Sequence, residues 1–228
     1  MNDLEQKLIE ELQCETVFTI PVLGGIPVSE AVVVTWIIMA VLVIAAFILT
    51  RNLKVDHISK RQAVAESIVT GLLNMVQGMV GEKGKAYVPY LTTVMLYIGV
   101  SNIIGLFGFK SPTKDLRVTV ALALMSIILI EAAGIYHKGV KRWLHGFVEP
   151  VAIVTPINIL EVVTKPLSLC MRLFGNVLGA FVIMELLKMI LPVGLPVVFS
   201  LYFDIFDGLL QAYVFVFLTS LYIDEITE

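Results

Sequence analysis

Long apolar runs without a charged side chain divide the first two thirds of the chain. Residues 31–50 form twenty consecutive uncharged positions, and residues 86–109 form another twenty-four. A run of about 18 apolar residues is enough for a helix to cross a bilayer. We therefore predict membrane-spanning helices over residues 31–50 and 87–108, and a third over 117–136. The acidic and then turn-rich residues 1–30 are expected to form a short extracytoplasmic tail.

Residues 61–80 follow a different pattern, with apolar side chains at helical spacing and polar ones on the other side. The apolar positions are Val64, Ile68, Leu72, Val76 and Val80, and the polar ones are Gln62, Glu66, Thr70 and Asn74. Such an amphipathic helix lies in the membrane interface or packs on a partner. We expect a connector that lies on the bilayer surface.

Residues 149–228 differ from the rest because their apolar segments carry isolated charges. The segment Leu191-Pro-Val-Gly-Leu-Pro196 predicts the turn of a hairpin of two long helices. As one helix, residues 156–191 would measure about 54 Å, against a hydrocarbon core of about 30 Å. Either Pro166 breaks this arm or the arm lies strongly tilted.

These patterns together predict an all-α fold class. The whole chain, residues 1–228, is expected to form a single polytopic membrane domain with about five membrane-spanning helices. Three spans and the amphipathic helix 61–80 fall within residues 31–148, and the long tilted hairpin occupies residues 149–228. We find no internal repeat and no low-complexity tract in the sequence.

The composition agrees with this class. Hydrophobic residues make up 58% of the 228 positions, the mean hydropathy is +0.92, and 15% of the residues are charged, whereas a soluble domain carries about 25%. This excludes intrinsic disorder and a disulfide-stapled scaffold, and the net charge of -3 indicates no nucleic-acid partner. Cys14 and Cys170 are expected to form no disulfide.

Basic residues cluster after the first and third predicted spans. The two clusters are Arg51, Lys54, Lys60 and Arg61, and Lys138, Lys141 and Arg142. The positive-inside rule places both on the cytoplasmic side. The N-terminus is then predicted outside and the C-terminus in the cytoplasm.

Arg172 is the most unusual residue, because no charged residue lies within six positions on either side of it. A central arginine costs about 2.5 to 3.5 kcal/mol on membrane-insertion scales. One interpretation is a structural ion pair with an acid on a neighbouring helix, and the other is a functional cation. At 100° per residue it shares one helix face with small or polar residues, namely Ser168, Gly175, Asn176 and Gly179. Those glycines permit either ordinary tight packing or close passage of a partner helix.

The second arm of the hairpin carries Asp204, Asp207 and Gln211, spaced i, i+3 and i+7 and hence on one face. Polar groups on one stripe of a membrane helix face the protein interior or a water-filled path. The alternative is that both aspartates cap the helix after the Pro196 turn. Glu161 either pairs with Lys165 or lines an aqueous vestibule.

Glu131 is a single carboxylate late in the third span, and the sequence does not identify its partner. The sequence holds no phosphate-binding glycine loop, nucleophile–base pair or Cys/His cluster. We therefore predict no catalytic residue, no cofactor and no metal site.

Three regions of the chain, residues 156–176, 111–124 and 209–219, carry a resemblance to a known family. Pro156-Ile-Asn-Ile-Leu-Glu161, Lys165-Pro-Leu-Ser168 and Met171-Arg-Leu-Phe-Gly-Asn176 closely resemble the signature of the a subunit of F-type ATP synthases. Ser111-Pro-Thr-Lys-Asp-Leu-Arg-Val-Thr-Val-Ala-Leu-Ala-Leu124 and Leu209-Leu-Gln-Ala-Tyr-Val-Phe-Val-Phe-Leu-Thr219 look like its outer loop with the following helix and its last helix. The resemblance spans most of the chain from about residue 56.

The resemblance implies that Arg172 is the family's essential arginine, with Asn176 and Gln211 as its polar neighbours. Asp204 takes the place of an ionisable residue seven positions before the glutamine. One departure is Phe181, where the family often has Glu or His. Asp204 then serves the outer ion path without that partner, or Glu185 substitutes for it.

The family implies two offset half-channels that carry protons or sodium ions and couple the flux to rotation of a c-ring and to ATP synthesis. We assign the outer one to Asp204, Asp207 and Asn176, and the inner one to Glu161 and Glu131. The expected partners are the rotor c-ring, the peripheral-stalk b subunits, the rest of the complex and membrane lipid. The expected location is a bacterial-type cell membrane, and ATP chemistry belongs to partner subunits, so the chain itself is not an enzyme.

Two other classes compete with this interpretation. A secondary transporter that binds an anionic substrate through Arg172 would have an inverted repeat and a discontinuous helix at mid-membrane. A purely structural anchor would give no reason for a lone arginine on a face of small residues.

Overall fold

The computed structural model describes residues 16–20, 26–51, 59–107, 109, 111–148, 154–190 and 194–227. Helices dominate this part of the chain, and five stretches are long and apolar enough to cross a membrane: Glu30–Thr50, Glu82–Phe107, Leu116–Lys138, Thr155–Leu187 and Val198–Thr227. The predicted all-α polytopic fold class is thus confirmed. An unpredicted short antiparallel hairpin, β1 (Thr16–Ile20) with β2 (Ile26–Ser29), precedes the first span.

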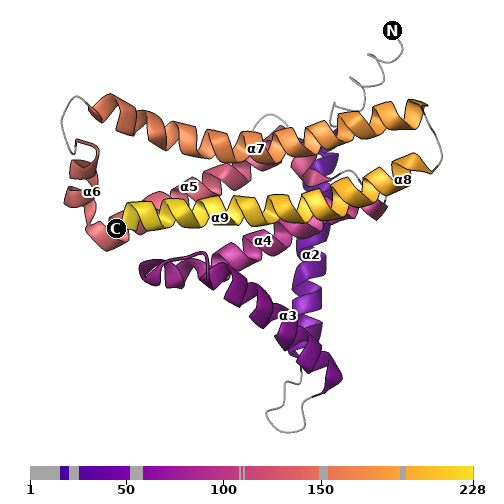
Figure 1. Ribbon diagram of the computed structural model, residues 1–228, viewed down its shortest axis with the longest axis horizontal. Coiled ribbons are helices and arrows are strands. Elements are labelled where there is room, and N and C mark those ends of the chain that lie inside the picture. The colour runs from indigo at the N-terminus through magenta and orange to yellow at the C-terminus, as the bar shows by residue number, and fades with distance from the viewer. Residues whose placement is uncertain are drawn as a thin grey trace.

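The first span is α2 (Glu30–Thr50), and the amphipathic helix is α3 (Lys60–Gln77). Helix α2 buries Ala31, Val34 and Ile38 and exposes most of its other large apolar side chains, as a helix bounded by lipid does. Ser59 caps the start of α3, because its side chain accepts a hydrogen bond from Gln62 N at 3.3 Å. Figure 1 shows α2 and α3 forming a V beside the other helices.

The second span combines a 3₁₀ turn, η1 (Glu82–Tyr87), with α4 (Val88–Ile103) and a further turn, η2 (Ile104–Phe107). After η3 (Pro112–Lys114), the third span is α5 (Leu116–Lys138), followed by the short α6 (Val140–Gly146). Asp115 caps α5 by accepting from Arg117 N at 2.9 Å, and it also accepts from Ser29 Oγ at 3.0 Å. One carboxylate thus joins the start of α5 to the start of α2.

The last third is the predicted hairpin. Its first arm, α7 (Thr155–Ile190), runs unbroken through Pro166, so of the two expected outcomes the structure takes the long helix. Its second arm consists of α8 (Leu195–Ser200), a π-helical segment η5 (Leu201–Asp207) and α9 (Gly208–Thr227). The π-helical interruption was not predicted.

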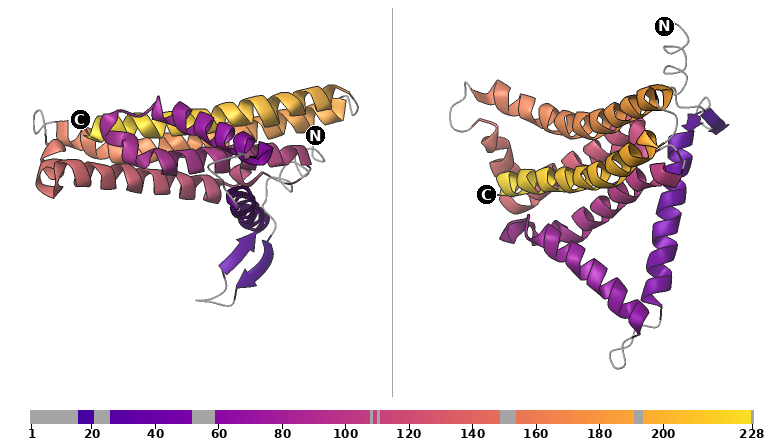
Figure 2. Two further views of the ribbon diagram at one scale, coloured as in Figure 1. Left: turned by 90° about the horizontal axis from the view of Figure 1, so that it is seen from below. Right: turned by 45° about the vertical axis from the view of Figure 1, so that its right-hand side comes forward.

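The core lies between four long helices that pack one on the next in the order α4, α9, α5 and α7. Helix α9 lies between α4 and α5, and α5 in turn packs on α7; Figure 1 shows α5 behind α7 and α9. The largest fully buried side chains at these contacts include Leu91, Ile98, Ile130, Leu173 and Phe215. In the edge-on view of Figure 2, left, these helices form a slab from which the β-hairpin projects.

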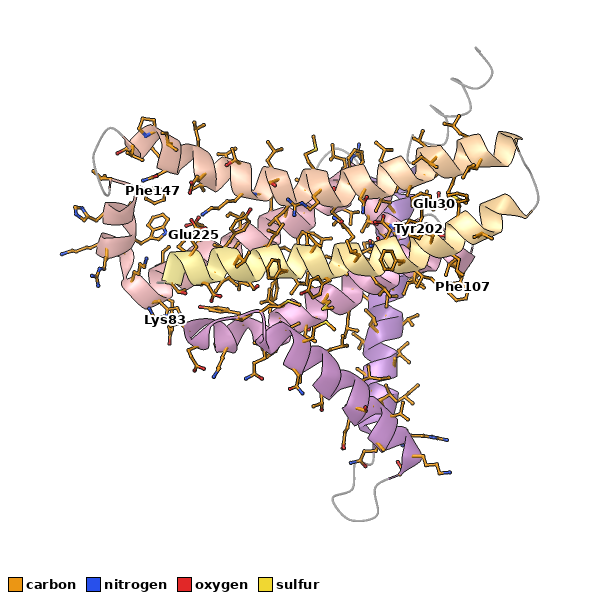
Figure 3. All side chains as sticks on the ribbon, viewed as in Figure 1. Glu30, Lys83, Phe107, Phe147, Tyr202 and Glu225 are labelled. Atoms are coloured by element: carbon orange, nitrogen blue, oxygen red, sulfur yellow. The ribbon has the colours of Figure 1, made fainter. Side chains whose placement is uncertain are left out.

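The C-terminal end of α9 is tied to the turn between α3 and η1. Asp224 accepts hydrogen bonds from Gly81 N at 3.0 Å with both carboxylate oxygens, and Lys83 Nζ donates to Thr227 O at 2.8 Å. Figure 3 shows Lys83, Glu225 and Phe147 at this end of the slab, and Glu30, Phe107 and Tyr202 at the opposite end. The slab thus has two distinguishable ends, and the polar groups described below lie near one or the other.

Candidate functional site

Arg172 lies in the middle part of α7 with its side chain exposed. Within the described part of the chain it forms neither an ion pair nor a hydrogen bond. The adjoining side of α7 buries Leu169, Cys170 and Leu173 against the core. Arg172 therefore lies outside the packed core, and the structural ion pair considered above is not present among the described residues.

The small residues around Arg172 border open space. An added Cβ at Gly175 or at Gly179 would meet nothing within 4 Å, and Ser168 is exposed. Tight packing inside this chain therefore does not explain the two glycines. Elsewhere glycines do serve close packing, because a Cβ at Gly134 would lie 2.7 Å from Ile226 Cγ1.

A cavity of about 380 Å³ lies beside this face. Its walls come from α4, η2, the loop before α5, α7, η5 and the start of α9. The three residues assigned to the outer path, Asn176, Asp204 and Asp207, all line it, and so does Gln211, the predicted polar neighbour of Arg172. The predicted face of the second arm is therefore turned inward, toward polar groups of other helices.

Asp204 is the half-buried carboxylate at the centre of η5. Its Oδ2 accepts a hydrogen bond from Ser200 Oγ at 2.7 Å, one turn earlier. A Cβ at Gly105, in η2, would lie 3.2 Å from Asp204 Oδ1, so this glycine lets η2 approach the carboxylate closely. Both aspartates lie in the π-helical segment, at least two helical turns after the second arm begins at Leu195, which excludes the helix-capping role that the sequence left open.

Hydrogen bonds of the buried Asn102 side chain hold the second arm against α4. Asn102 Nδ2 donates to Gly208 O at 2.9 Å, and Thr113 Oγ1 donates to Asn102 Oδ1 at 2.7 Å. A Cβ at Gly208 would lie 2.7 Å from Asn102 Cβ, so α9 can approach this closely because position 208 is glycine. The contact falls where η5 gives way to α9, and π-helical turns are frequent at functional sites.

The two arms of the hairpin meet through a pair of carboxamides. Asn176 Nδ2 donates to Gln211 Oε1 at 3.2 Å, one helical turn beyond Arg172 along α7. Gln211 is 3% exposed, and its Nε2 has no hydrogen-bond partner in the described chain. A buried donor without a partner is costly, which marks this position as one where an incoming acceptor would be stabilised.

Phe181 also lines the cavity, with a cation directly over it. Lys114 Nζ lies 2.8 Å from the centroid of the Phe181 ring, which is a cation–π contact between the loop before α5 and α7. Glu185 lines the same cavity one turn further along α7. The sequence expectation that Glu185 substitutes for an ionisable residue at position 181 stays a prediction, now with Glu185 and Asp204 on one cavity.

The predicted inner residues lie outside this cavity. Lys165 Nζ lies 3.5 Å from Glu161 Oε2 and 3.0 Å from Glu225 Oε1, so Glu161 belongs to a partly exposed ion-pair group at the Glu225 end of the slab (Figure 3). Glu131 accepts a hydrogen bond from Trp143 Nε1 at 2.9 Å. That bond supplies the partner that the sequence did not identify.

Sequence reasoning missed several residues that line the cavity. Asn102 was not singled out, and Ser111 and Lys114 were named only as part of the segment 111–124, without a role. For Asn102 a signal existed, because it is a polar side chain late in the uncharged run of residues 86–109. Among the described residues, no group of three or more His, Cys, Asp or Glu is placed to hold a metal ion.

The five spans and the polar cavity between them define the class: a multi-pass helical membrane protein with ionisable groups placed as in ion-transporting proteins. The family described as "ATP synthase A chain" matches residues 32–224. Among similar proteins, "ATP synthase subunit a" of Moorella thermoacetica is 35% identical over 88% of this chain and 92% of that protein. "ATP synthase subunit a, sodium ion specific" of Propionigenium modestum is 34% identical over 87% and 74%.

A third relative, "ATP synthase subunit a 1" of Crocosphaera subtropica, is 30% identical over 87% of this chain and 86% of its own length. This chain belongs to the ATP synthase subunit a family, a membrane-sector component of F-type ATP synthases. The resemblance drawn from the three motifs is thereby confirmed. The continuous α7 around Arg172 also lacks the discontinuity that the transporter alternative requires.

Proposed function

We propose that this subunit carries protons or sodium ions across a cell membrane through two offset half-channels and couples their flux to rotation of a c-ring and to ATP synthesis. The observation that carries the proposal is the exposed Arg172, which has no ion pair in the described part of the chain, on a face of small residues beside a polar cavity. A guanidinium left facing lipid is costly. A partner carboxylate on that face would remove the cost.

The rotor would supply this carboxylate. A ring of small subunits, each with one carboxylate, can turn through lipid only when each carboxylate is neutralised by a proton or a sodium ion. Beside the positively charged Arg172, the ionised form of the rotor carboxylate is favoured and the ion is released. The open space over Gly175 and Gly179 is where the rotor helix would pass.

The outer half-channel is assigned to the cavity of about 380 Å³. Asp204 and Asp207 would attract the cation and pass it along the cavity toward Asn176 and Gln211. The unpartnered Gln211 Nε2 supplies a donor to an entering water molecule or carboxylate. The Asn176–Gln211 hydrogen bond lies one turn from Arg172, so the path would end at the rotor face.

The inner half-channel is assigned to Glu161 and Glu131, toward the opposite end of the slab. Eleven residues separate Glu161 from Arg172, about 16 Å along α7. Arg172 would then stand between the two paths as an electrostatic block. The membrane field supplies about 2.3 kcal/mol per charge per 100 mV, and peripheral-stalk b subunits would hold the subunit still against the turning ring.

The test is an Arg172→Ala substitution in the assembled complex. We expect ATP synthesis by energised membrane vesicles to fall below about one hundredth, because the rotor carboxylate loses the cation that releases its ion. Arg117→Ala, which removes an exposed arginine at the start of α5, is the matched control and should leave synthesis within about twofold. Co-purification of a ring of small hairpin proteins verifies assembly, and normal synthesis by an assembled Arg172→Ala complex would refute the mechanism.

The coupling ion is identified in the same vesicles. ATP-driven transport is measured with and without sodium at fixed pH. Acidification of the vesicle lumen without sodium assigns protons, and uptake that requires sodium assigns sodium. Loss of both activities in Arg172→Ala is expected in either case.

A further inference from the structure

The segment around α6 carries cations that the proposed ion path does not use. Lys141 and Arg142 are exposed and Lys138 is half-buried. In the described part of the chain none of the three forms an ion pair or a hydrogen bond. These three positive charges within five residues, which have no acidic partner in the described part of the chain, are free to attract a negatively charged group.

Helix α6 presents this charge beside exposed apolar side chains. At 100° per residue, Lys141 adjoins Leu144 and Val140, which are 55% and 56% exposed, and Arg142 follows on the next part of the surface of α6, beyond Lys141. The remaining side is held to the protein, because Trp143 donates to Glu131. A fixed helix with adjoining cationic and apolar surfaces is typical of the membrane interface.

Two apolar grooves continue from this helix. One, of about 440 Å³, lies between α6 and α7 and is lined by Leu144, Phe147, Ile159, Val162 and Val163. The other, of about 580 Å³, lies between α5 and α7. Both are lined by Val162 and Val163, so they adjoin at those residues. The lining is apolar except for Glu131, whose carboxylate accepts the hydrogen bond from Trp143.

We propose that this surface is a binding site for one anionic phospholipid. The headgroup phosphate binds Lys138, Lys141 and Arg142, and an acyl chain occupies the grooves that adjoin at Val162 and Val163. A zwitterionic phospholipid satisfies the grooves but carries no net charge for the cations. The site uses neither Arg172 nor the cavity beside Asp204, and it shares only Glu131, which lines the second groove, with the proposed inner path.

The test uses Trp143 as a built-in probe at the site. The chain has two tryptophans, so a Trp36→Phe background leaves Trp143 as the single fluorophore. The full-length subunit in detergent is titrated with phosphatidylglycerol or phosphatidylcholine brominated on the acyl chains, because bromine quenches tryptophan at short range. We expect half-maximal quenching at about tenfold lower concentration of phosphatidylglycerol.

Charge is tested with two matched triple variants in that background. Lys138→Gln/Lys141→Gln/Arg142→Gln should raise the phosphatidylglycerol concentration for half-quenching about tenfold or more, since each cation contributes to headgroup binding. Arg51→Gln/Lys60→Gln/Arg61→Gln removes the same charge from exposed residues elsewhere and should change it less than twofold. Circular dichroism and gel filtration verify that both variants are folded.

The groove is tested with Val163→Phe, which fills it, against Val69→Phe on the exposed side of α3. The former should weaken phosphatidylglycerol quenching at least about threefold and the latter should not. Equal quenching by both lipids, equal loss in both triple variants, or an unaffected Val163→Phe would each overturn the proposal. Quenching by neither lipid would also overturn the proposal. The cations would then be available to bind an acidic segment of a partner protein instead.

Discussion

At the scale of single residues, the environment of each carboxylate separates their roles. Asp204 is half-buried in a polar cavity and accepts from Ser200, whereas Glu161 is held in an ion pair with Lys165 and Glu131 is bonded to Trp143. An acidic group that is reached from a cavity and carries no ion pair in the described chain is suited to exchange a cation.

Asp204→Asn is therefore expected to lower ATP-driven ion transport at least about tenfold. The amide keeps the shape of the side chain and can still bond Ser200 Oγ, but it cannot take up a cation. Transport is measured in reconstituted vesicles, with Glu82→Gln, an exposed carboxylate at the other end of the slab, as control. Unchanged transport in Asp204→Asn would remove this residue from the ion path.

At the scale of elements, glycines distinguish the two faces of the hairpin. Gly208 lies where α9 meets Asn102, so that an added methyl group must displace atoms, while Gly175 faces open space on α7. Helices in lipid associate through side-chain packing. Gly208 therefore allows the close approach of α9 to α4. Gly175 has no such packing role inside the described chain, and we expect it to serve an interaction with another molecule.

Matched alanine substitutions test this difference. Gly208→Ala should lower the stability of the subunit in detergent by about 1–3 kcal/mol through overpacking. Gly175→Ala should raise it by up to about 1 kcal/mol through helix propensity and still reduce ATP synthesis in the complex. Thermal unfolding and vesicle synthesis are the two measurements; a destabilised Gly175→Ala subunit would mean that Gly175 packs inside its own chain.

At the scale of the whole molecule, the slab has one end with the polar cavity and another with the ion-pair group (Figure 3). Arg172 lies between them on an exposed face. The C-terminus of α9 is fastened by Asp224 and Lys83, which holds the second arm in position along its length. A rigid slab with one open functional face is suited to act as a stator against a moving partner.

This arrangement predicts that the rotor covers Ser168. In a Cys14→Ser background, with Cys170 buried, a Ser168→Cys subunit alone in detergent should react with a maleimide. In the assembled complex the reaction should be at least about tenfold slower. Thr93→Cys, exposed on α4, provides the reference for access to the reagent, and equal reactivity of position 168 in both states would contradict a covered face.

The local sequence pattern was sufficient to predict the membrane spans, the amphipathic helix and the shared face of Asp204, Asp207 and Gln211. These features depend on the lengths of apolar runs and on spacing within one helix, and both are properties of neighbouring residues. The motif around Arg172 was also enough to suggest the family, because its residues are neighbours along the chain. The sequence therefore determined that the chain lies in a lipid bilayer, how many spans it has, and which charged residues lie in apolar segments.

The tertiary structure decided which of those residues meet. Asn102 donates a hydrogen bond to Gly208, and Lys114 lies over the ring of Phe181. Neither pair is related by helical spacing, so the sequence pattern did not predict these contacts. The structure also decided that Arg172 is exposed while Gln211 is buried, because exposure depends on how α5, α7 and α9 pack against each other. Contacts between distant segments set the cavity, the open face and the lipid-sized grooves, and no local pattern encodes them.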